Sequence, residues 1–200
     1  MRKLTKSDYR ISDWSGGKTV QIAIAPEDAQ YADRAFLWRL SSATVDLDES
    51  DFTPLPDYMR LIAPLRGGMR LTHNGGMSVD LAPYEIHRFD GADATHSWGC
   101  CTDFNLMLRK GACDGSITAV SGGPGEEKVF VPAPESETVV IYCTEGSIAV
   151  SCGEESAKLA EREAILLQGK LIRPVSITFS AGSRAMCAQV WRTEYNRNQR

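Results

Sequence analysis

The sequence predicts an all-β protein made of two similar barrel-like units, and three observations lead to this fold class. Short runs rich in valine, isoleucine, threonine and aromatic residues recur along the 200-residue chain, separated by turn-forming residues. Helical periodicity is nearly absent, and only residues 27–38 (EDAQYADRAFLW) are compatible with a short helix or, equally, a loop. The third observation is an internal repeat.

The repeat places glycines at a constant spacing. When residues 60–91 are laid without gaps over residues 138–169, Gly68, Gly75 and Gly91 each meet a glycine 78 positions further on. Glycine recurs at turns because a positive φ costs little for glycine alone, so the same hairpin bends are expected twice. A further strand follows each copy, and we expect three residues of the first, Phe104, Leu106 and Leu108, to correspond to Met186, Ala188 and Val190.

Two units of roughly 80 residues, each made of hairpins with glycine-rich turns, suit the double-barrel jelly roll of a bicupin. We place the first cupin-like unit, including the N-terminal strands, at residues 1–124 and the second at residues 125–200 of one compact bicupin. The glycine-rich segment 121–127 (SGGPGEE) is taken as the linker between them. Barrels of this kind hold small ligands in the mouth or the interior.

Residues 101–109 (CTDFNLMLR) show two different faces when extended, because side chains alternate along a strand. One face is apolar, with Phe104, Leu106 and Leu108. The other carries Asp103, Asn105, Met107 and Arg109. This second face is either solvated or a pocket wall. The corresponding strand AMCAQVW has only Gln189 among apolar residues, so a pocket is expected in the first unit.

Polar residues recur in the same way on other strands of the first half. Arg39 and Ser41 share a face opposite Trp38, and Arg60 precedes an apolar run. If these residues converge with Thr19 and Asn105, they form an anion or carboxylate site, because arginine offers a bidentate fork and hydroxyls and amides fix orientation. The alternative is a wet outer face on which the arginines pair with Asp51, Asp57 or Asp103.

Composition excludes several partners. The net charge is −4, with 22 basic and 26 acidic residues, which is not the footprint of a nucleic-acid-binding protein. The N-terminal residues lack the apolar core of a secretory signal, and no apolar run approaches the length of a membrane span. We therefore expect a cytoplasmic protein without membrane contact, whose six cysteines are reduced thiols.

Metal and cofactor signatures are missing. Metal-binding cupins use a His-x-His pair with a further glutamate and histidine, whereas His73, His87 and His96 are widely separated. Each is expected to be a surface or structural residue. There is no nucleophile elbow, P-loop or dinucleotide fingerprint either, so we expect no metal, no cofactor and no catalytic residue of these classes.

A set of short motifs resembles the HutD/Ves family in order and spacing, from about Trp14 to Trp191. The motifs are Trp14-Ser-Gly-Gly-Lys-Thr19, Trp38-Arg-Leu-Ser-Ser-Ala43, Asp51-Phe-Thr with Leu55-Pro56 and Arg60, Phe89-Asp-Gly91 and Asp103-Phe-Asn-Leu-Met107. The chain departs from the family at Gln21, where an acid is common, and in the glycine segments near Ser15 and Asp51. These changes bear on the choice of ligand.

The resemblance implies a metal-free bicupin with no established catalytic activity. Family members near histidine-utilisation genes look like governors of that pathway that bind urocanate or formylglutamate, and the Ves branch is associated with cold and stress response. The ligand-binding residues that it implies here are Thr19, Trp38, Arg39, Ser41, Arg60, Asp103, Phe104, Asn105 and Met107.

Three functions follow as hypotheses. The first is a non-catalytic sensor of a small carboxylate metabolite. The second is a cofactor-free isomerase or lyase that uses Asp103 or His87 as a base. The third is a structural or interaction module whose first barrel is filled by side chains. The sequence is compatible with a homodimer in each case.

Overall fold

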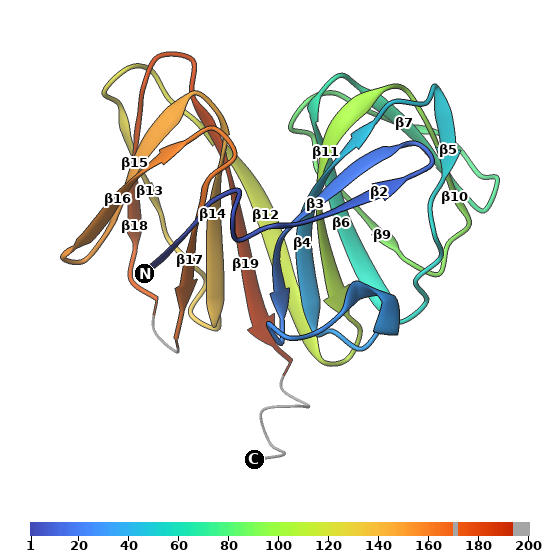
Figure 1. The fold of residues 1–200 in the computed structure, drawn as a ribbon, viewed down its shortest axis with the longest axis horizontal. Helices are drawn as coiled ribbons and strands as arrows, with labels where there is room; N and C mark the ends of the chain where they lie inside the picture. Colours follow the sequence, from blue (N-terminus) through green and yellow to red (C-terminus); the bar gives the residue numbers. More distant parts are fainter. Residues whose placement is uncertain (170–171, 194–200) are drawn as a thin grey trace. The chain divides into compact units, whose positions relative to one another are not determined.

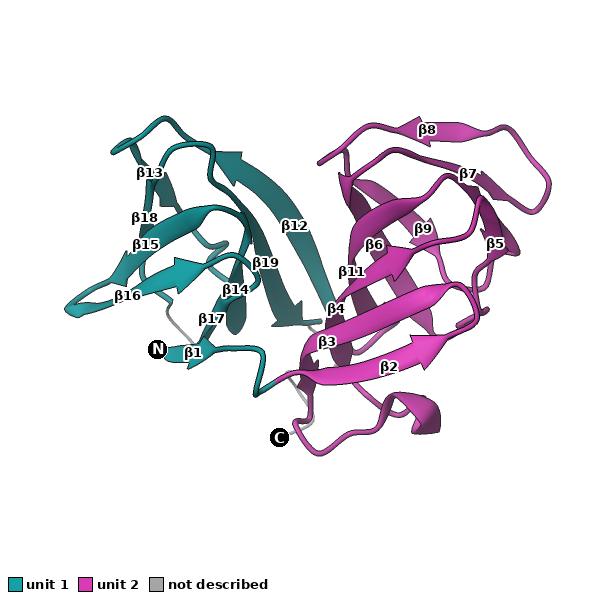
Figure 2. Ribbon diagram, turned by 45° about the horizontal axis from the view of Figure 1, so that its top comes forward, with its two compact units in different colours: residues 1–8, 114–200 teal, residues 9–113 magenta. Residues whose placement is uncertain are grey.

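The computed structural model describes residues 1–169 and 172–193, and it divides the chain into two compact units (Figures 1 and 2). Unit 2 comprises Tyr9–Cys113, and unit 1 combines Met1–Asp8 with the chain from Asp114 onward. Apart from one 3-10 turn, η1 at Tyr31–Asp33, the elements of the described residues are strands, which confirms the all-β prediction. No helix in this part of the chain is long and apolar enough to cross a membrane.

Unit 2 consists of two antiparallel sheets. A six-stranded sheet has the order β2-β3-β4-β11-β6-β9, and a four-stranded sheet has the order β5-β10-β7-β8. The strands are β2 (Arg10–Trp14), β3 (Gly17–Ala25), β4 (Trp38–Val45), β5 (Glu49–Asp51), β6 (Tyr58–Arg66), β7 (Met69–His73), β8 (Val79–Leu81), β9 (His87–Asp90), β10 (Thr95–Trp98) and β11 (Cys101–Arg109).

Unit 1 repeats this plan with a five-stranded sheet, β1-β17-β14-β19-β12, and a four-stranded sheet, β13-β18-β15-β16. Its strands are β1 (Arg2–Leu4), β12 (Cys113–Ser121), β13 (Glu127–Phe130), β14 (Thr138–Glu145), β15 (Ser147–Cys152), β16 (Glu155–Ala160), β17 (Ala164–Gln168), β18 (Val175–Phe179) and β19 (Arg184–Arg192).

The internal repeat is visible in this topology. The neighbours β4-β11-β6-β9 and β5-β10-β7-β8 of unit 2 correspond to β12-β19-β14-β17 and β13-β18-β15-β16 of unit 1, so each strand has its counterpart eight strands later. The division therefore falls between β11 and β12, not near residue 125 as the sequence suggested. Segment 121–127 connects β12 to β13 within unit 1, because β12 pairs with β19, and the N-terminal β1 pairs with β17.

Register identifies the equivalent residues. In β6, Leu65 is the bulged residue next to Pro64, which pairs with Asp103. In β14, Thr144 is the bulged residue next to Cys143, which pairs with Ala185. Asp103 is therefore equivalent to Ala185. Counting on along both strands makes Phe104, Leu106 and Leu108 equivalent to Met186, Ala188 and Val190, as predicted.

One part of the glycine overlay needs a correction. In the first hairpin the turn glycine with positive φ is Gly67 (φ 73°), and its counterpart is Gly146 (φ 68°). Gly68 is thus one position away from the equivalence assigned by the ungapped overlay. The spacing of 78 holds from Gly75 and Gly153 onward, where both glycines again have positive φ (68° and 63°).

The two interiors differ in polarity. Unit 1 encloses an apolar cluster that includes Val139, Ile141 and Cys187, each 0% exposed. Register places Arg60 of unit 2 at the position of Val139 and Asn105 at that of Cys187. The apolar residues of unit 2 form separate clusters, one of which consists of Val45, Ile62, Met69, Leu71, Leu81, Phe89 and Cys101.

This asymmetry predicts opposite effects of two reciprocal substitutions. Cys187→Asn buries an amide among apolar side chains, so it is expected to lower the free energy of unfolding by about 1–3 kcal/mol. Asn105→Cys removes a buried amide and is expected to leave stability unchanged or slightly higher. Urea denaturation of both variants measures this, and equal losses would contradict the assignment of the two interiors.

Candidate functional site

A pocket of about 370 Å³ lies in unit 2 against the wall formed by β3, β4, β11 and β6. Pairing across these strands creates the wall, because paired residues point to the same face. Met107 lies opposite both Arg39 and Arg60, and Asn105 lies opposite Ser41. Seven of the nine ligand-binding residues expected from the sequence line this pocket: Thr19, Arg39, Ser41, Arg60, Asp103, Asn105 and Met107.

Trp38 and Phe104 do not line the pocket. Each lies next to a pocket residue along its strand, Arg39 and Asp103 respectively, and alternation turns it to the opposite face of the sheet. Both are buried there, with 6% and 0% of their surface exposed. The resemblance to the family motifs is therefore no evidence that these two side chains bind a ligand, and their position indicates a packing role.

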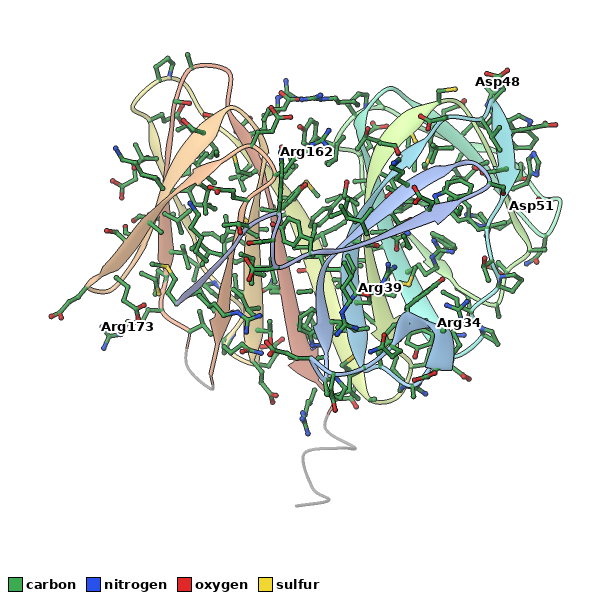
Figure 3. All side chains as sticks on the ribbon, viewed as in Figure 1. Arg34, Arg39, Asp48, Asp51, Arg162 and Arg173 are labelled. Atoms are coloured by element: carbon green, nitrogen blue, oxygen red, sulfur yellow. The ribbon has the colours of Figure 1, made fainter. Side chains whose placement is uncertain are left out.

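Arg39 is held in a fixed orientation. Its Nε donates to Gln21 Oε1 at 2.9 Å and its Nη1 donates to Ser41 Oγ at 3.2 Å. Gln21 reaches this face because it lies two residues after the pocket residue Thr19 on β3 and pairs with Ser41. The Tyr31 ring lies 4.3 Å from the Arg39 guanidinium carbon and 3.9 Å from that of Arg34; both arginines are labelled in Figure 3. Burial lowers the pKa of Arg39.

Arg60 is buried, and none of the carboxylates in the described ranges forms a hydrogen bond with it. Its guanidinium carbon lies 4.7 Å from the Phe52 ring and 5.1 Å from the Phe89 ring, and its Nε has no hydrogen-bond partner. Burial lowers the pKa of Arg60 to about 10, so the side chain still carries its charge at neutral pH. Rings stacked near a guanidinium leave the in-plane N–H groups available to a ligand.

Asp103 is the carboxylate of the inner wall. Its Oδ1 accepts a hydrogen bond from the Ala43 backbone N–H at 3.1 Å. Burial raises the pKa of Asp103 to about 6, against the opposing effects of that hydrogen bond and of the Arg60 and Arg39 charges. No ion pair within 4 Å joins Asp103 to either arginine in the described part of the chain. Arg39 and Arg60 are 4% and 6% exposed, so they do not lie on the wet outer face that was the alternative.

Asn105 provides a second unsatisfied group. It is 5% exposed, and its Oδ1 is buried without a hydrogen-bond partner. Met107, also on β11, packs in a small cluster with Phe36 and Tyr58 beside the pocket. The wall therefore holds a donor on Arg60 and an acceptor on Asn105 that no protein group among the described residues satisfies.

Sequence reasoning missed Tyr31, Phe52 and Gln21 as parts of the site. Tyr31 lies on η1, within the segment for which the sequence left helix and loop open, and such a segment has no periodicity that predicts a direction. Phe52 belongs to the Asp51-Phe-Thr motif but follows an edge strand, β5, whose position depends on its pairing with β10. For Gln21, the sequence did hold a signal, because glutamine stands at a position where the family commonly has an acidic residue.

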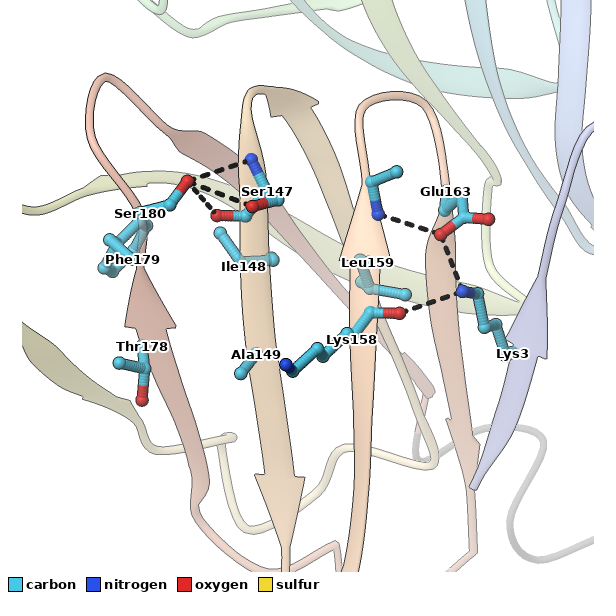
Figure 4. Close-up of a pocket in the computed structure, with 11 residues that line it drawn as sticks. Lys3, Ser147, Ile148, Ala149, Lys158, Leu159, Glu163, Thr178, Phe179 and Ser180 are labelled. Atoms are coloured by element: carbon cyan, nitrogen blue, oxygen red, sulfur yellow. Dashed lines mark hydrogen bonds and ion pairs between the residues drawn. The ribbon is translucent and has the colours of Figure 1, made fainter. Parts of the chain in front are cut away.

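A pocket of about 470 Å³ in unit 1 differs in character (Figure 4). Its polar groups satisfy one another: Lys3 Nζ contacts Glu163 Oε2 at 2.7 Å and donates to Lys158 O at 2.9 Å. Ser180 Oγ donates to Ser147 O at 2.8 Å. Its lining shows no buried unpaired polar atom, so we take the unit 2 pocket as the functional site.

The three histidines lie outside the pocket lining. His73 ends β7 and His87 begins β9, and their Nε2 atoms are 2.9 Å apart. His96 lies on β10, and its Nδ1 contacts Asp51 Oδ1 at 2.7 Å. Among residues 1–169 and 172–193, no group of three or more His, Cys, Asp or Glu side chains could hold a metal ion.

The family model described as HutD matches residues 6–187. The chain belongs to the HutD family. Among solved structures, it is similar to the conserved protein PA5104 from Pseudomonas aeruginosa PAO1, with 24% identity, a TM-score of 0.79 and coverage of 96% of this chain and 98% of that one. It is also similar to HutD from Pseudomonas fluorescens SBW25, determined in a formate condition, with 23% identity, a TM-score of 0.75 and coverage of 96% of this chain and 98% of that one. No curated protein sequence matches the chain.

More distant neighbours establish the cupin-like fold of this HutD protein. YhhW from Escherichia coli, a pirin whose structure includes nickel(II), gives 8% identity, a TM-score of 0.68 and coverage of 94% of this chain and 97% of that one. The pocket here does not fit such an ion. Its lining has three carboxylates, Asp13, Asp51 and Asp103, but they do not form a metal-binding group among the described residues, and it has no imidazole. Arg39 and Arg60 in the same lining repel cations.

Proposed function

We propose that this HutD protein binds a small carboxylate metabolite in the unit 2 pocket without converting it, and that it regulates histidine utilisation by sensing urocanate or formylglutamate. The observation that carries the proposal is the pair of buried unsatisfied atoms, Arg60 Nε and Asn105 Oδ1, on one pocket wall. A buried polar group without a partner costs about 1–3 kcal/mol, so a ligand that satisfies both groups recovers that energy.

The chemistry of the wall fits such a ligand. Arg39 is oriented by Gln21 and Ser41, and Arg60 lies against aromatic rings, so both guanidinium groups can donate to one carboxylate. Asn105 Oδ1 accepts from an N–H, which both the imidazole of urocanate and the amide of formylglutamate provide. This combination of a carboxylate and a nearby N–H donor is common to the two proposed ligands.

Two further findings support the proposal. A HutD structure from Pseudomonas fluorescens was determined in a formate condition, and formate is the smallest carboxylate, although at 23% identity that structure shows only the shared fold here. All six cysteines are free, which fits a reducing compartment, and we place the protein in the cytoplasm on that basis. The pocket itself favours a binding role over a purely structural module.

A thermal-shift panel tests the proposal. Urocanate, formylglutamate and formate are expected to raise the melting temperature of the protein by mass action, with the larger ligands acting at lower concentration. Arg60→Ala should abolish the shift. Arg70→Ala is the matched control, because Arg70 is an exposed arginine of the same unit, paired with Asp80. If no carboxylate in a broad panel shifts the melting temperature, the proposal fails.

Asp103 favours a second candidate, a cofactor-free isomerase or lyase. Its carboxyl lines the pocket, and a pKa of about 6 places it within the range of a general base at neutral pH. His87 is the weaker candidate because its Nε2 is engaged by His73. An NMR time course of each ligand with wild type and Asp103→Asn decides: turnover lost in the variant supports an enzyme, and unchanged ligands support a sensor.

A further inference from the structure

The histidines of β7 and β9 form a directly hydrogen-bonded pair. His73 Nε2 and His87 Nε2 are 2.9 Å apart, their ring centroids are 5.0 Å apart, and their planes differ by 21°. Rings this far apart cannot lie face to face with such a short nitrogen contact. They meet edge to edge, as in an N–H···N hydrogen bond in which one ring donates and the other accepts.

The neighbours of His73 determine which ring donates. Thr95 Oγ1 donates to the Asp93 backbone oxygen at 3.2 Å, so it accepts from His73 Nδ1 at 2.9 Å. His73 therefore carries its proton on Nδ1, and its Nε2 accepts from His87 Nε2–H. The lone pair of His87 Nδ1 is then the free basic atom of the pair. A second added proton would place two cations in direct contact, so the pair takes up one proton only.

One aromatic ring connects this pair to the pocket. Phe89 lies 4.8 Å from the His73 ring and 5.8 Å from the His87 ring, and the Arg60 guanidinium carbon lies 5.1 Å from the same Phe89 ring. Burial lowers the pKa of His73, and the Arg60 charge lowers it further. Burial and the neighbouring His73 lower the pKa of His87. The charge of Arg60 therefore disfavours a positive charge at His73, the ring that is hydrogen-bonded to His87.

We propose that anion binding at Arg60 is coupled to the uptake of one proton by the His73–His87 pair. The coupling rests on the proposed function, because it requires an anion in the unit 2 pocket. The proton adds to His87 Nδ1, and the resulting imidazolium keeps its Nε2–H bond to His73. A bound carboxylate neutralises the field of Arg60, so the protonated pair becomes more stable when the pocket is occupied.

The sign of the coupling follows from linkage. Because the occupied protein holds the proton more tightly, affinity for the anion rises as the pH falls between the midpoints of the free and occupied pair, by at most about tenfold per pH unit. Two acidic groups act on the same region. Asp93 favours the protonated form of His73, and Asp103 partly offsets the charge of Arg60. The sensor thus responds to acidity as well as to its ligand.

Histidine NMR tests the proton site. Between pH 5 and 8, the His73 and His87 signals are expected to show one common titration, and formate should raise its midpoint without moving that of His96. Arg60→Met should raise the midpoint in the absence of formate, whereas Arg60→Lys should keep it low. Separate full titrations of His73 and His87, or a midpoint that ignores Arg60→Met, would overturn the proposal.

Binding measurements test the coupling. Formate is the probe, because its carboxyl stays ionised across this pH range whereas urocanate has its own imidazole. His87→Gln retains an N–H donor for His73 but cannot take up the proton, so it should lose part of the pH dependence of formate affinity; His96→Gln is the control and should keep it. Identical pH dependence in wild type and His87→Gln refutes the coupling. If formate fails to bind at all, the proposed function fails, and the response of the pair to Arg60→Met is still measured.

Discussion

Replacing Arg60 with methionine is expected to stabilise the ligand-free protein and to abolish carboxylate binding. Arg60 is 6% exposed, its Nε lacks a partner, and no carboxylate of the described residues forms an ion pair with it. A methionine of similar length removes the buried charge and keeps contact with the Phe52 and Phe89 rings. We expect the free energy of unfolding to rise by about 1–3 kcal/mol, the cost of a buried unsatisfied group.

Urea denaturation and calorimetric titration with formylglutamate measure the two effects on the same samples. Arg70→Met is the control, because it removes an arginine of unit 2 that is exposed and paired with Asp80; it should change neither property appreciably. A destabilised Arg60→Met protein that still binds would show that Arg60 is a structural residue. A gain in stability together with lost binding would show that the charge is retained for function.

Asp103→Asn is expected to strengthen carboxylate binding at pH 7.5 and to remove most of its pH dependence. With a pKa of about 6, Asp103 is largely ionised at pH 7.5 and repels an incoming carboxylate, whereas below pH 6 it is protonated. Affinity in wild type should therefore fall as the pH rises through about 6. The asparagine retains an oxygen that accepts from Ala43 N–H, so the local structure should persist.

The same substitution changes stability in a definite direction. The pKa of Asp103 is raised in the folded state from 3.8, so its contribution to stability is complete below pH 3.8 and is lost as the pH rises through about 6. At pH 7.5 the variant should be more stable by about 2–3 kcal/mol, from about 1.4 kcal/mol per pKa unit.

Melting temperatures and formate affinities of wild type and Asp103→Asn from pH 4.5 to 8 check both statements. Glu163→Gln is the control, because Glu163 is a partly buried carboxylate of unit 1 that pairs with Lys3, and the hydrogen bond from Lys3 lowers its pKa. Any pH dependence of affinity left in Asp103→Asn is assigned to the His73–His87 pair and should disappear in the double variant with His87→Gln. A wild-type affinity that rises with pH would refute the role given to Asp103.

The wall of the pocket was predictable from the sequence because strand alternation is a local property. Asp103, Asn105 and Met107 had to share a face wherever the strand lay, and the structure brings them beside Arg39 and Arg60. The same rule argues against Trp38 and Phe104, which were included on the strength of family motifs. Motifs record which residues occur together, whereas alternation decides which of them can touch one ligand.

The pocket residues that lie outside this strand wall, Tyr31 and Phe52, were not predictable in this way. Tyr31 lies on a single 3-10 turn and Phe52 follows a three-residue strand, and neither segment has a period from which a direction follows. The register shift in β3 after Gln21 likewise sets which residue pairs with Arg39, because it places Ile24 opposite that arginine. Irregular backbone of this kind is fixed by pairing with distant strands.

By itself, the sequence determined the all-β class, the duplication and the polar face of each wall strand, because these follow from residue periodicity and glycine spacing. The tertiary structure decided where the duplicated units divide, since strand pairing assigns β1 and β12 to unit 1. It also decided that Arg60 and Asn105 keep unsatisfied groups and that His73 meets His87. Contacts between residues far apart in the chain depend on register, and register is set by the packing of the whole unit.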